Sequence, residues 1–319
     1  MLATCPSGDC GVFAIAMQEM RQFNFYGYRL SSPWDLSWLP PWRESEIASG
    51  EVSLIEAEVP ESLPDSIERG PFIEIGREGE VLLDVKHAGR FLLRDGREIL
   101  VSPYGNAPSE AFQSFLTGSV AGMLFHQNSR LALHASAVVV RGKAILLSGW
   151  ATVGKSALAA ALMEQGAAFL SDDLCLIDVS REGAMVSAGP SRLRLWPDVG
   201  DHLGFPKEAR CPLRPGLRKF TLVTEAASPV PAGLLVRAED AHHRSVHFQR
   251  LRGMHSVMPP HSLVYQHRFA GLLQRQTSML TALGALAGAV PAIRMEYPRQ
   301  MQHLRELASL LLQHVETYW

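Results

Sequence analysis

An eight-residue loop constrains the fold of this chain most. Gly149-Trp150-Ala151-Thr152-Val153-Gly154-Lys155-Ser156 fits the pattern G-x-x-x-x-G-K-[ST]. An apolar run of strand character precedes the loop, and strong helix formers follow it from Lys155 to Gln165, with Gly166 as the expected helix C-cap. This order of strand, glycine-bracketed turn and helix predicts an α/β domain with a phosphate-binding loop. The alternative is an ordinary strand-turn-helix corner that ends in Lys-Ser.

The residue types in the loop suit the binding of a nucleotide. Glycines allow backbone N–H groups to turn toward phosphate oxygens, and the helix N-terminus adds a partial positive charge. Lys155 is placed to reach the outer phosphates, and Ser156 offers a hydroxyl ligand to a metal ion. We therefore expect residues 149–157, including Ala157, to bind a nucleotide, with a metal ion on Ser156.

Two adjacent acids, Asp172 and Asp173, follow the next apolar run, "AFLS". A return strand after the helix is expected to run beside the first strand and to bring its carboxyl end near the loop. Magnesium takes a carboxylate beside the loop serine, and a second carboxylate is able to accept the proton of an attacking hydroxyl. We predict that the two aspartates together supply the carboxylates of the metal site and the base. The alternative is an exposed Asp-Asp turn.

Composition and charge indicate a globular protein of about two domains. The chain has 319 residues, of which 47% are hydrophobic and 19% charged, and its formal net charge is -2. These values favour neither disorder nor a basic surface for nucleic acid. Apolar runs are too short to span a bilayer, and the N-terminus lacks the pattern of a secretory signal, so we expect a cytoplasmic protein without a membrane partner.

The four cysteines, Cys5, Cys10, Cys175 and Cys211, contain no C-x-x-C pair. The spacing of Cys5 and Cys10 is by itself a weak signal for a metal or a disulfide. We expect free thiols in a reducing compartment.

Residues 1–108 are predicted to form a β-rich domain. Alternating apolar segments flank Asp95-Gly96, which is a hairpin signal. A helix is expected over 109–130, where Ser109 precedes an apolar pattern that has helical spacing and Glu110 lies in the first turn. This helix is predicted to connect the two domains.

Residues 131–319 are predicted to form the phosphate-loop domain. Two strands around Arg141-Gly142-Lys143 lead into the loop, and "AFLSDDLCLID" is expected to be one strand. Residues 189–206 look loop-rich, and 218–250 alternate as strands do. Helices are expected over 262–290 and over 298–315, the second of which has Pro298 near its N-terminus. The apolar stripes of these helices indicate core, with an oligomer interface or a peptide-docking face as the alternative.

Three features together resemble the HPr kinase/phosphorylase C-terminal domain and its relatives among the peptide-modifying kinases of bacterial biosynthetic clusters. They are "LHASAV" with His134, the loop through Ser156, and "SDD" at its spacing after Lys155. The resemblance covers about residues 130–200. It implies an HPr kinase-like α/β fold, ATP and Mg2+ on the loop lysine and serine, a histidine near the phosphates, and Asp173 as the base that activates a substrate serine.

The segment "PSRLRLWPD" is similar to the kinases linked to lasso-peptide and related ribosomal peptide clusters. This similarity implies a precursor peptide as the partner. The chain departs from the family at Thr152, where another glycine is common. The acidic metal ligand of true HPr kinases has only Asp198 as a candidate counterpart.

Several basic residues are further candidates for the site. Arg192 and Arg194 alternate along one strand and are candidates to bind phosphate or an acidic peptide, and Lys219 and Arg268 are weaker ones. Without the resemblance, His134 fits a structural histidine as well as a catalytic one. His242, His243 and His247 lack the cysteine or carboxylate pattern of a metal site, so we expect a solvated loop there.

The sequence therefore predicts a kinase that transfers the γ-phosphoryl group of ATP to a serine hydroxyl of a peptide, with a lasso-type precursor as the expected substrate. The alternatives are a kinase of a small metabolite, a kinase that also runs phosphorolysis, and a nucleotide-sensing module that binds ATP without transfer. A mechanical or transport ATPase would call for further signature elements that the sequence does not display. A homo-oligomer is compatible with the sequence.

Overall fold

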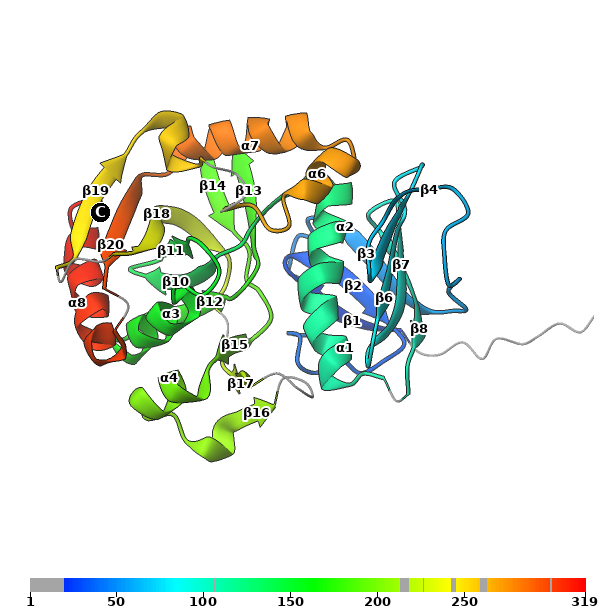
Figure 1. Ribbon diagram of the computed structural model, residues 1–319, viewed down its shortest axis with the longest axis horizontal. Helices are drawn as coiled ribbons and strands as arrows, with labels where there is room; N and C mark the ends of the chain where they lie inside the picture. Colours follow the sequence, from blue (N-terminus) through cyan, green and yellow to red (C-terminus); the bar gives the residue numbers. More distant parts are fainter. Residues whose placement is uncertain are drawn as a thin grey trace, which may run out of the picture.

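The computed structural model describes residues 20–319 except 106, 213–217, 226, 242–244, 259–262 and 299. The chain is a mixed α/β protein in which a strand-rich N-terminal region is followed by a second, curled sheet with helices on both faces. Figure 1 shows a helix, built from α1 and α2, that stands between the two sheets.

The N-terminal sheet has eight strands in the order β1-β2-β3-β8-β7-β6-β5-β4. Its pairs are antiparallel except for β2 with β3 and β3 with β8. The strands are β1 (Arg21–Phe25), β2 (Tyr28–Ser32), β3 (Glu51–Glu56), β4 (Ser66–Arg69), β5 (Ile73–Gly76), β6 (Val81–Val85), β7 (Gly89–Arg94) and β8 (Glu98–Pro103). The predicted hairpin is confirmed between β7 and β8. Asp95 and Gly96 have φ of 53° and 65°, the two positive values of a type I′ turn.

The connecting helix begins where the sequence predicts. The hydroxyl of Ser109 accepts a hydrogen bond from the N–H of Phe112 at 3.2 Å and caps the helix. The helix runs through α1 (Glu110–Phe115), a π-helical turn η1 (Leu116–Val120) and α2 (Ala121–Gln127). Its buried face packs into one core with the N-terminal sheet and with Leu174, Leu176 and Tyr265 of the second sheet region. The helix is therefore part of the packing of both halves.

The second sheet has the strand order β12-β10-β11-β18-β14-β13-β9, with β20 paired to β18 and β19. A small third sheet joins β15, β17 and β16. The strands are β9 (Leu131–Leu133), β10 (Ser136–Val140), β11 (Lys143–Ser148), β12 (Ala168–Ser171), β13 (Cys175–Ser180), β14 (Gly183–Val186), β15 (Arg192–Leu195), β16 (Arg210–Pro212), β17 (Phe220–Val223), β18 (Val230–Asp240), β19 (His247–Leu251) and β20 (Ala292–Tyr297).

The remaining elements are helical. They are α3 (Lys155–Glu164), α4 (Pro197–His202), η2 (Lys207–Ala209), η3 (Gly253–Ser256), α6 (Arg268–Leu272), α7 (Gln276–Ala289), η4 (Met301–His303) and α8 (Leu304–Val315).

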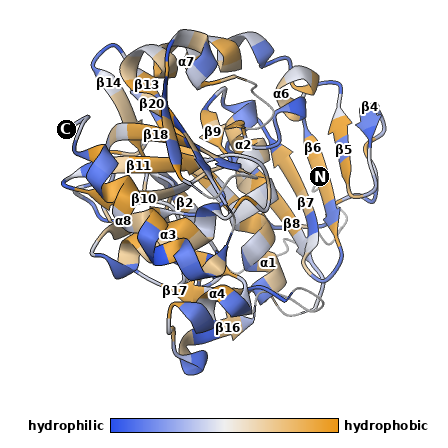
Figure 2. Cartoon of the chain, turned by 60° about the vertical axis from the view of Figure 1, so that its left-hand side comes forward, coloured by the Kyte–Doolittle hydropathy of each residue, from blue (hydrophilic) through white to orange (hydrophobic). Residues whose placement is uncertain are grey.

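Residues 144–147 of strand β11 are all apolar because both faces of the strand are buried. Ile145 and Leu147 pack in the same core as α3 and α8, whereas Ala144 and Leu146 pack in the core that includes α7. A strand buried on both faces has no polar side to alternate with. Figure 2 shows the same concentration of hydrophobic residues along the strands. Across the described ranges, no helix combines the length and the apolar character that spanning a membrane requires.

The return strand is not placed as predicted. Strand β12 runs parallel to β11 but does not pair with it, because β10 lies between them and is antiparallel to both. The segment predicted as one strand is two, β12 and β13, which are broken at residues 172–174 and belong to opposite ends of the sheet path. The two aspartates therefore occupy a turn at which the chain changes its place in the sheet.

Three other element predictions are wrong in part. The segment 189–206 contains strand β15 and helix α4 instead of being loop-rich. The helix expected over 262–290 begins at α6 and is interrupted before α7, and the last helix begins at Leu304 instead of near Pro298. The strands expected within 218–250 are confirmed as β17, β18 and the beginning of β19.

Candidate functional site

The loop after β11 has the backbone of a tight turn that requires glycine at its start. Gly149 has φ of 133°, and a Cβ atom there would lie 2.4 Å from the carbonyl oxygen of Ala238 on β18. Gly154, with φ of 107°, is the N-cap of α3. The hydroxyl of Tyr297 donates to the carbonyl of Val153 at 2.8 Å and fixes the far side of the loop. The loop is thus anchored to β18 and β20 on either side.

Thr152 occupies the position where the resembled family commonly has glycine. Its φ is 71°, in the left-handed region that disfavours a residue with a Cβ, most of all a β-branched one. The backbone therefore takes the turn that glycine would take, with threonine in its place. Threonine at this position adds backbone strain to the loop, but the turn still forms.

The other loop positions divide into core and surface. Val153 is buried in the core under α3, and Ala157 packs against that core. Ala151 is exposed, and Trp150 keeps 59% of its surface exposed at the loop tip. The loop is therefore packed into the core at Val153 and exposed to solvent at Trp150 and Ala151.

Lys155 is buried and bonded to its own loop. Its Nζ donates to the carbonyl oxygens of Gly149 at 3.0 Å and of Trp150 at 3.2 Å. Burial lowers the pKa of Lys155, and Asp173 and Asp172 oppose that shift. An ammonium that bonds two loop carbonyls braces the loop and lies next to the space that the loop encloses.

Asp172 is a buried acceptor that draws three donors together. Its Oδ1 accepts from Ser136 Oγ at 2.6 Å and from Ser156 Oγ at 2.8 Å, and its Oδ2 accepts from the backbone N–H of Arg194 at 3.0 Å. These bonds join β10, α3, the turn after β12 and β15 at one carboxylate. The predicted approach of the acidic pair to the loop serine is present in the structure.

The spacing of Ser156 and Asp172 suits magnesium. Two ligands at adjacent corners of an octahedron, each at 2.0–2.1 Å from the ion, lie about 2.9 Å apart. The 2.8 Å between Ser156 Oγ and Asp172 Oδ1 is close to that spacing. Magnesium takes one or two carboxylates and keeps several waters, so one hydroxyl and one carboxylate from the protein form an adequate set.

Asp173 faces Arg194 and His134 instead of Ser156 and Asp172. Arg194 Nη1 lies 3.1 Å from its Oδ2, and His134 Nδ1 lies 3.4 Å from its Oδ1. Burial would raise the pKa of Asp173, but Arg194, with His134, Lys219 and Lys155, outweighs burial and holds the pKa below its ordinary value. Asp173 is therefore a carboxylate at neutral pH. Its φ of 71° turns the chain so that the two aspartate side chains meet different partners.

His134 lies in the break between β9 and β10. Its Nδ1 is 3.0 Å from the carbonyl oxygen of Asp173, and its backbone N–H donates to Leu263 at 2.7 Å. Burial lowers the pKa of His134, with Asp173 opposing the shift, so the imidazole is neutral at pH 7. A neutral Nδ1–H donated to this carbonyl leaves Nε2 as an acceptor.

A cleft of about 260 Å³ lies beside Ser156, Asp172 and Asp173, and neither Lys155 nor His134 is among its lining residues. It is lined from one side by the loop serine, the two aspartates, Arg194 and Lys219, and from the other by the connecting helix and Tyr265. The lining residues are Ser114, Phe115, Gly118, Ser119, Ser156, Asp172, Asp173, Arg194, Lys219 and Tyr265.

The four basic candidates have different places. Arg194 and Lys219 line the cleft, whereas Arg192 and Arg268 are not among its lining residues. Arg192 pairs with Glu110 at 3.0 Å and holds the connecting helix against β15. Arg268 is exposed on α6 over the ring of Phe269. Arg194 also donates to the carbonyl of Ser114 and to Thr117 Oγ1, so it joins Asp173 to the connecting helix.

Sequence reasoning missed the other wall of the cleft. Ser136 lies in the quoted "LHASAV" run but carried no assignment, although it bonds Asp172. Gly118 and Ser119 are small residues on a helix otherwise spaced as core, which is a weak signal of a surface that must stay open. Tyr265 comes from a segment more than ninety residues after the aspartates, and nothing in its surroundings marks it.

The histidines and cysteines considered as metal ligands form no metal site among the described residues. No group of three or more His, Cys, Asp or Glu residues is arranged for a metal ion within the described part of the chain. His242 and His243 lie outside the described residues, and His247 Nε2 is 2.8 Å from Ser245 Oγ. Cys175 and Cys211 are free thiols, as predicted, and Cys5 and Cys10 lie outside the described residues.

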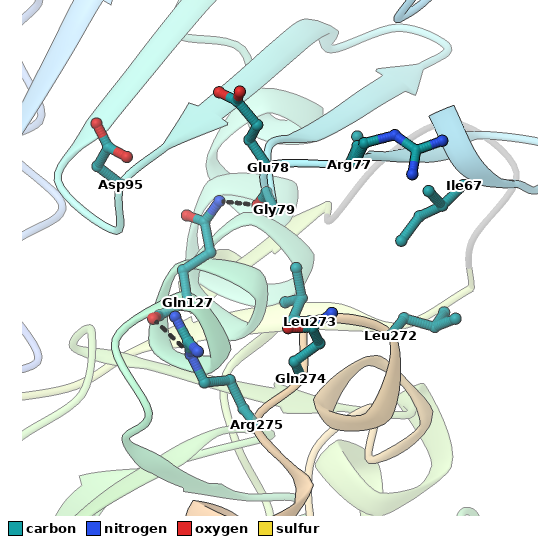
Figure 3. Close-up of a pocket in the computed structure, with 11 residues that line it drawn as sticks. Ile67, Arg77, Glu78, Gly79, Asp95, Gln127, Leu272, Leu273, Gln274 and Arg275 are labelled. Atoms are coloured by element: carbon teal, nitrogen blue, oxygen red, sulfur yellow. Dashed lines mark hydrogen bonds between the residues drawn. The ribbon is translucent and has the colours of Figure 1, made fainter. Parts of the chain in front are cut away.

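A second cavity, of about 320 Å³, lies between the N-terminal sheet and the α6–α7 connection. Figure 3 shows Gln127, at the end of α2, bonded to Gly79 on one side and to Arg275 on the other. Its acids and bases, which include Arg77, Glu78 and Asp95, are exposed turn residues. None of residues 149–157, and neither Asp172 nor Asp173, lines this cavity.

Comparisons with known proteins leave the function to be argued from the site. No family model matches the chain, and no curated protein does. Among solved structures, the chain is similar to the Hpr(Ser) kinase/phosphatase from Coxiella burnetii, with 12% identity and a TM-score of 0.32 over 58% of this chain and 97% of that one.

Proposed function

We propose that this protein is an ATP-dependent kinase that transfers the γ-phosphoryl group to a serine hydroxyl of a peptide. One observation carries the proposal. Ser156 Oγ and Asp172 Oδ1 lie 2.8 Å apart, a spacing that suits two ligands of one magnesium ion, while Asp173, the next residue, lines the same cleft and is paired with Arg194. A site for metal and a site for an attacking hydroxyl are what phosphoryl transfer requires.

The loop and Lys155 would hold the phosphates of ATP. The backbone of residues 149–154 encloses the N-terminus of α3, whose partial positive charge favours an anion. Lys155 begins with two bonds to loop carbonyls, and exchanging those bonds for phosphate oxygens keeps the ammonium paired. Lys155 then neutralises charge on the group in transfer.

Ser156 and Asp172 would hold magnesium, which when bound neutralises charge on the phosphate oxygens and orients them. Ser136 and the N–H of Arg194 already satisfy other lone pairs of Asp172. These bonds fix the direction of the carboxylate, as outer partners of a metal ligand do.

Asp173 would accept the hydrogen of the serine hydroxyl. As the bond from the serine oxygen to the γ-phosphorus forms, the bond from that phosphorus to the bridging oxygen of ADP breaks, and the hydroxyl proton passes to the carboxylate. The products are ADP, a phosphoserine and a proton that Asp173 later releases to water. Because its pKa is depressed, Asp173 acts first to orient the hydroxyl and receives the proton late.

The peptide class rests on the resemblance of residues 190–198 to kinases of ribosomal peptide clusters. In the structure this segment forms β15 and the beginning of α4 and supplies Arg194 to the cleft. The cleft volume of about 260 Å³ favours a second candidate, a small hydroxyl metabolite, which fits without a longer groove. A module that binds ATP without transfer would have no use for the arrangement around Asp173.

The proposal is tested by mass spectrometry of a candidate precursor peptide, encoded beside the gene of this protein, after incubation with ATP and magnesium. We expect one added phosphoryl group on a serine with wild type and none with Asp173→Asn, which should still bind ATP. Asp178→Asn is the matched control, because Asp178 lies on β13 and pairs with Arg130 on the surface. Transfer by Asp173→Asn at the wild-type rate would refute the role of Asp173.

A further inference from the structure

Tyr265 is held in place by its backbone on both sides. Its N–H donates to the carbonyl of Ala132 at 2.9 Å, and its carbonyl accepts from the Nε2 of the buried His126 at 2.8 Å. The preceding residue, Val264, forms a β-bridge with Leu133 of β9. These bonds fix the backbone of Tyr265 and so the direction of its Cα–Cβ bond.

Two glycines of the connecting helix make room for the ring of Tyr265. A Cβ atom at Gly122 would lie 2.6 Å from ring carbons, and one at Gly118 would lie 3.3 Å from the hydroxyl. Glycine within a helix is unfavourable relative to alanine, so two such positions facing one ring indicate that the space is needed for the tyrosine.

Tyr265 lines the cleft that contains Ser156 and Asp173, and its hydroxyl lies 3.3 Å from the Cβ position of Gly118, another lining residue. The side chain of Ser119, which opposes the upward shift of the Tyr265 pKa, lines the same cleft. Burial raises the pKa of Tyr265, with Asp173 adding to the shift, so the phenol keeps its proton and remains a donor. A fixed donor thus lies on the wall opposite the phosphate loop.

We propose that the Tyr265 phenol determines acceptor specificity by donating a hydrogen bond to a carbonyl oxygen of the acceptor. The attacking hydroxyl itself is a poor partner for this donor, because a hydrogen bond donated to a nucleophilic oxygen withdraws the electron pair that must form the new bond. A backbone carbonyl near the hydroxyl is the matching acceptor, and a serine within a peptide has its own carbonyl on one side and that of the preceding residue on the other. This inference rests on the proposed function and extends it to the choice of acceptor.

The test compares two simple acceptors with ATP and magnesium. N-acetyl-L-serinamide has a primary hydroxyl and two carbonyl groups, whereas ethanol has the hydroxyl alone. Tyr265→Phe removes one oxygen and keeps the ring. Loss of one hydrogen bond should lower kcat/KM for N-acetyl-L-serinamide by about 2- to 12-fold and leave transfer to ethanol unchanged.

Tyr26→Phe is the matched control, because it also removes a buried phenol that bonds the connecting helix. Its hydroxyl donates to the carbonyl of Thr117 at 2.8 Å, and Tyr26 is not a lining residue of the cleft. Circular dichroism and ATP affinity confirm that each variant is folded. We expect Tyr26→Phe to treat the two acceptors as wild type does.

Each outcome decides between the claims. An equal fall for both acceptors, the same selective fall in Tyr26→Phe, or no change in Tyr265→Phe overturns the role of Tyr265 while wild-type transfer to the serinamide still upholds the kinase. A wild-type protein that phosphorylates neither probe contradicts the proposed function, and the role of Tyr265 fails with it.

Discussion

Gly149→Ala should destabilise the protein and weaken nucleotide binding, because the phosphate loop begins against the backbone of β18. The added Cβ would lie 2.4 Å from the carbonyl oxygen of Ala238 and 3.3 Å from Val153. The first contact is with backbone, so no side chain is able to move aside. The loop or β18 must shift, and the N–H groups that would bind phosphate shift with them.

The magnitude separates into two parts. Holding alanine at φ of 133° costs about 1–3 kcal/mol, and the close contact adds about 1–3 kcal/mol more. Gly183→Ala is the matched control, since Gly183 has φ of 140° with no atom within 4 Å of the added Cβ. It bears the conformational strain alone, and both variants gain the same small entropy term from the unfolded chain.

The assay is urea unfolding followed by far-ultraviolet circular dichroism, together with ATP titration. We expect Gly149→Ala to lose about 1–3 kcal/mol more than Gly183→Ala and to bind ATP at least about tenfold more weakly, whereas Gly183→Ala binds ATP normally. Equal destabilisation by the two variants, with ATP binding retained in both, would refute the close approach of the loop to β18.

Three further predictions follow from single contacts. Asp172→Asn should raise the magnesium concentration for half-maximal transfer by about 10- to 100-fold, measured from initial rates, and an unchanged value would exclude Asp172 as a ligand. Thr152→Gly should raise stability by no more than about 1.5 kcal/mol, because relief of a left-handed threonine (about 1–2 kcal/mol) exceeds or balances the entropy cost of glycine (about 0.5–1 kcal/mol). A loss of stability in urea would show that the threonine side chain holds the loop. Glu164→Gln should lower the melting temperature at pH 7, because hydrogen bonds from Arg305 hold the pKa of Glu164 below its ordinary value. That contribution is present above the unfolded pKa, about 4.3, and is lost as pH falls through the folded value, so a difference in melting temperature that persists at pH 2 would contradict it.

Local signals in the sequence predicted local structure well. The Asp95-Gly96 turn, the Ser109 cap and the strand pair around Gly142 each depend on a few neighbouring residues whose φ preferences or side-chain bonds act within one turn. The turn at residues 149–154 and the helix that follows it belong to the same class, since they lie within twenty residues. The approach of Asp172 to Ser156 was predicted, although the strand pairing from which it was argued is not the one in the structure.

Long-range placement could not be predicted in the same way. Nothing near Ala168 indicates that β10 lies between β12 and β11, because that choice depends on the packing of the whole sheet. The division of labour between Asp172 and Asp173 depends on the positive φ of Asp173 and on Arg194, which approaches from a different sheet. Tyr265 reaches the cleft only because two helix glycines leave room for its ring.

The central claim is tested most directly by following label from the γ-phosphate of ATP into a serine acceptor, with wild type, Asp173→Asn and Asp178→Asn compared at equal ATP occupancy. The account predicts labelled phosphoserine with wild type and Asp178→Asn and none with Asp173→Asn. Label that appears equally with all three proteins, or with none of them while ATP is bound, would contradict it.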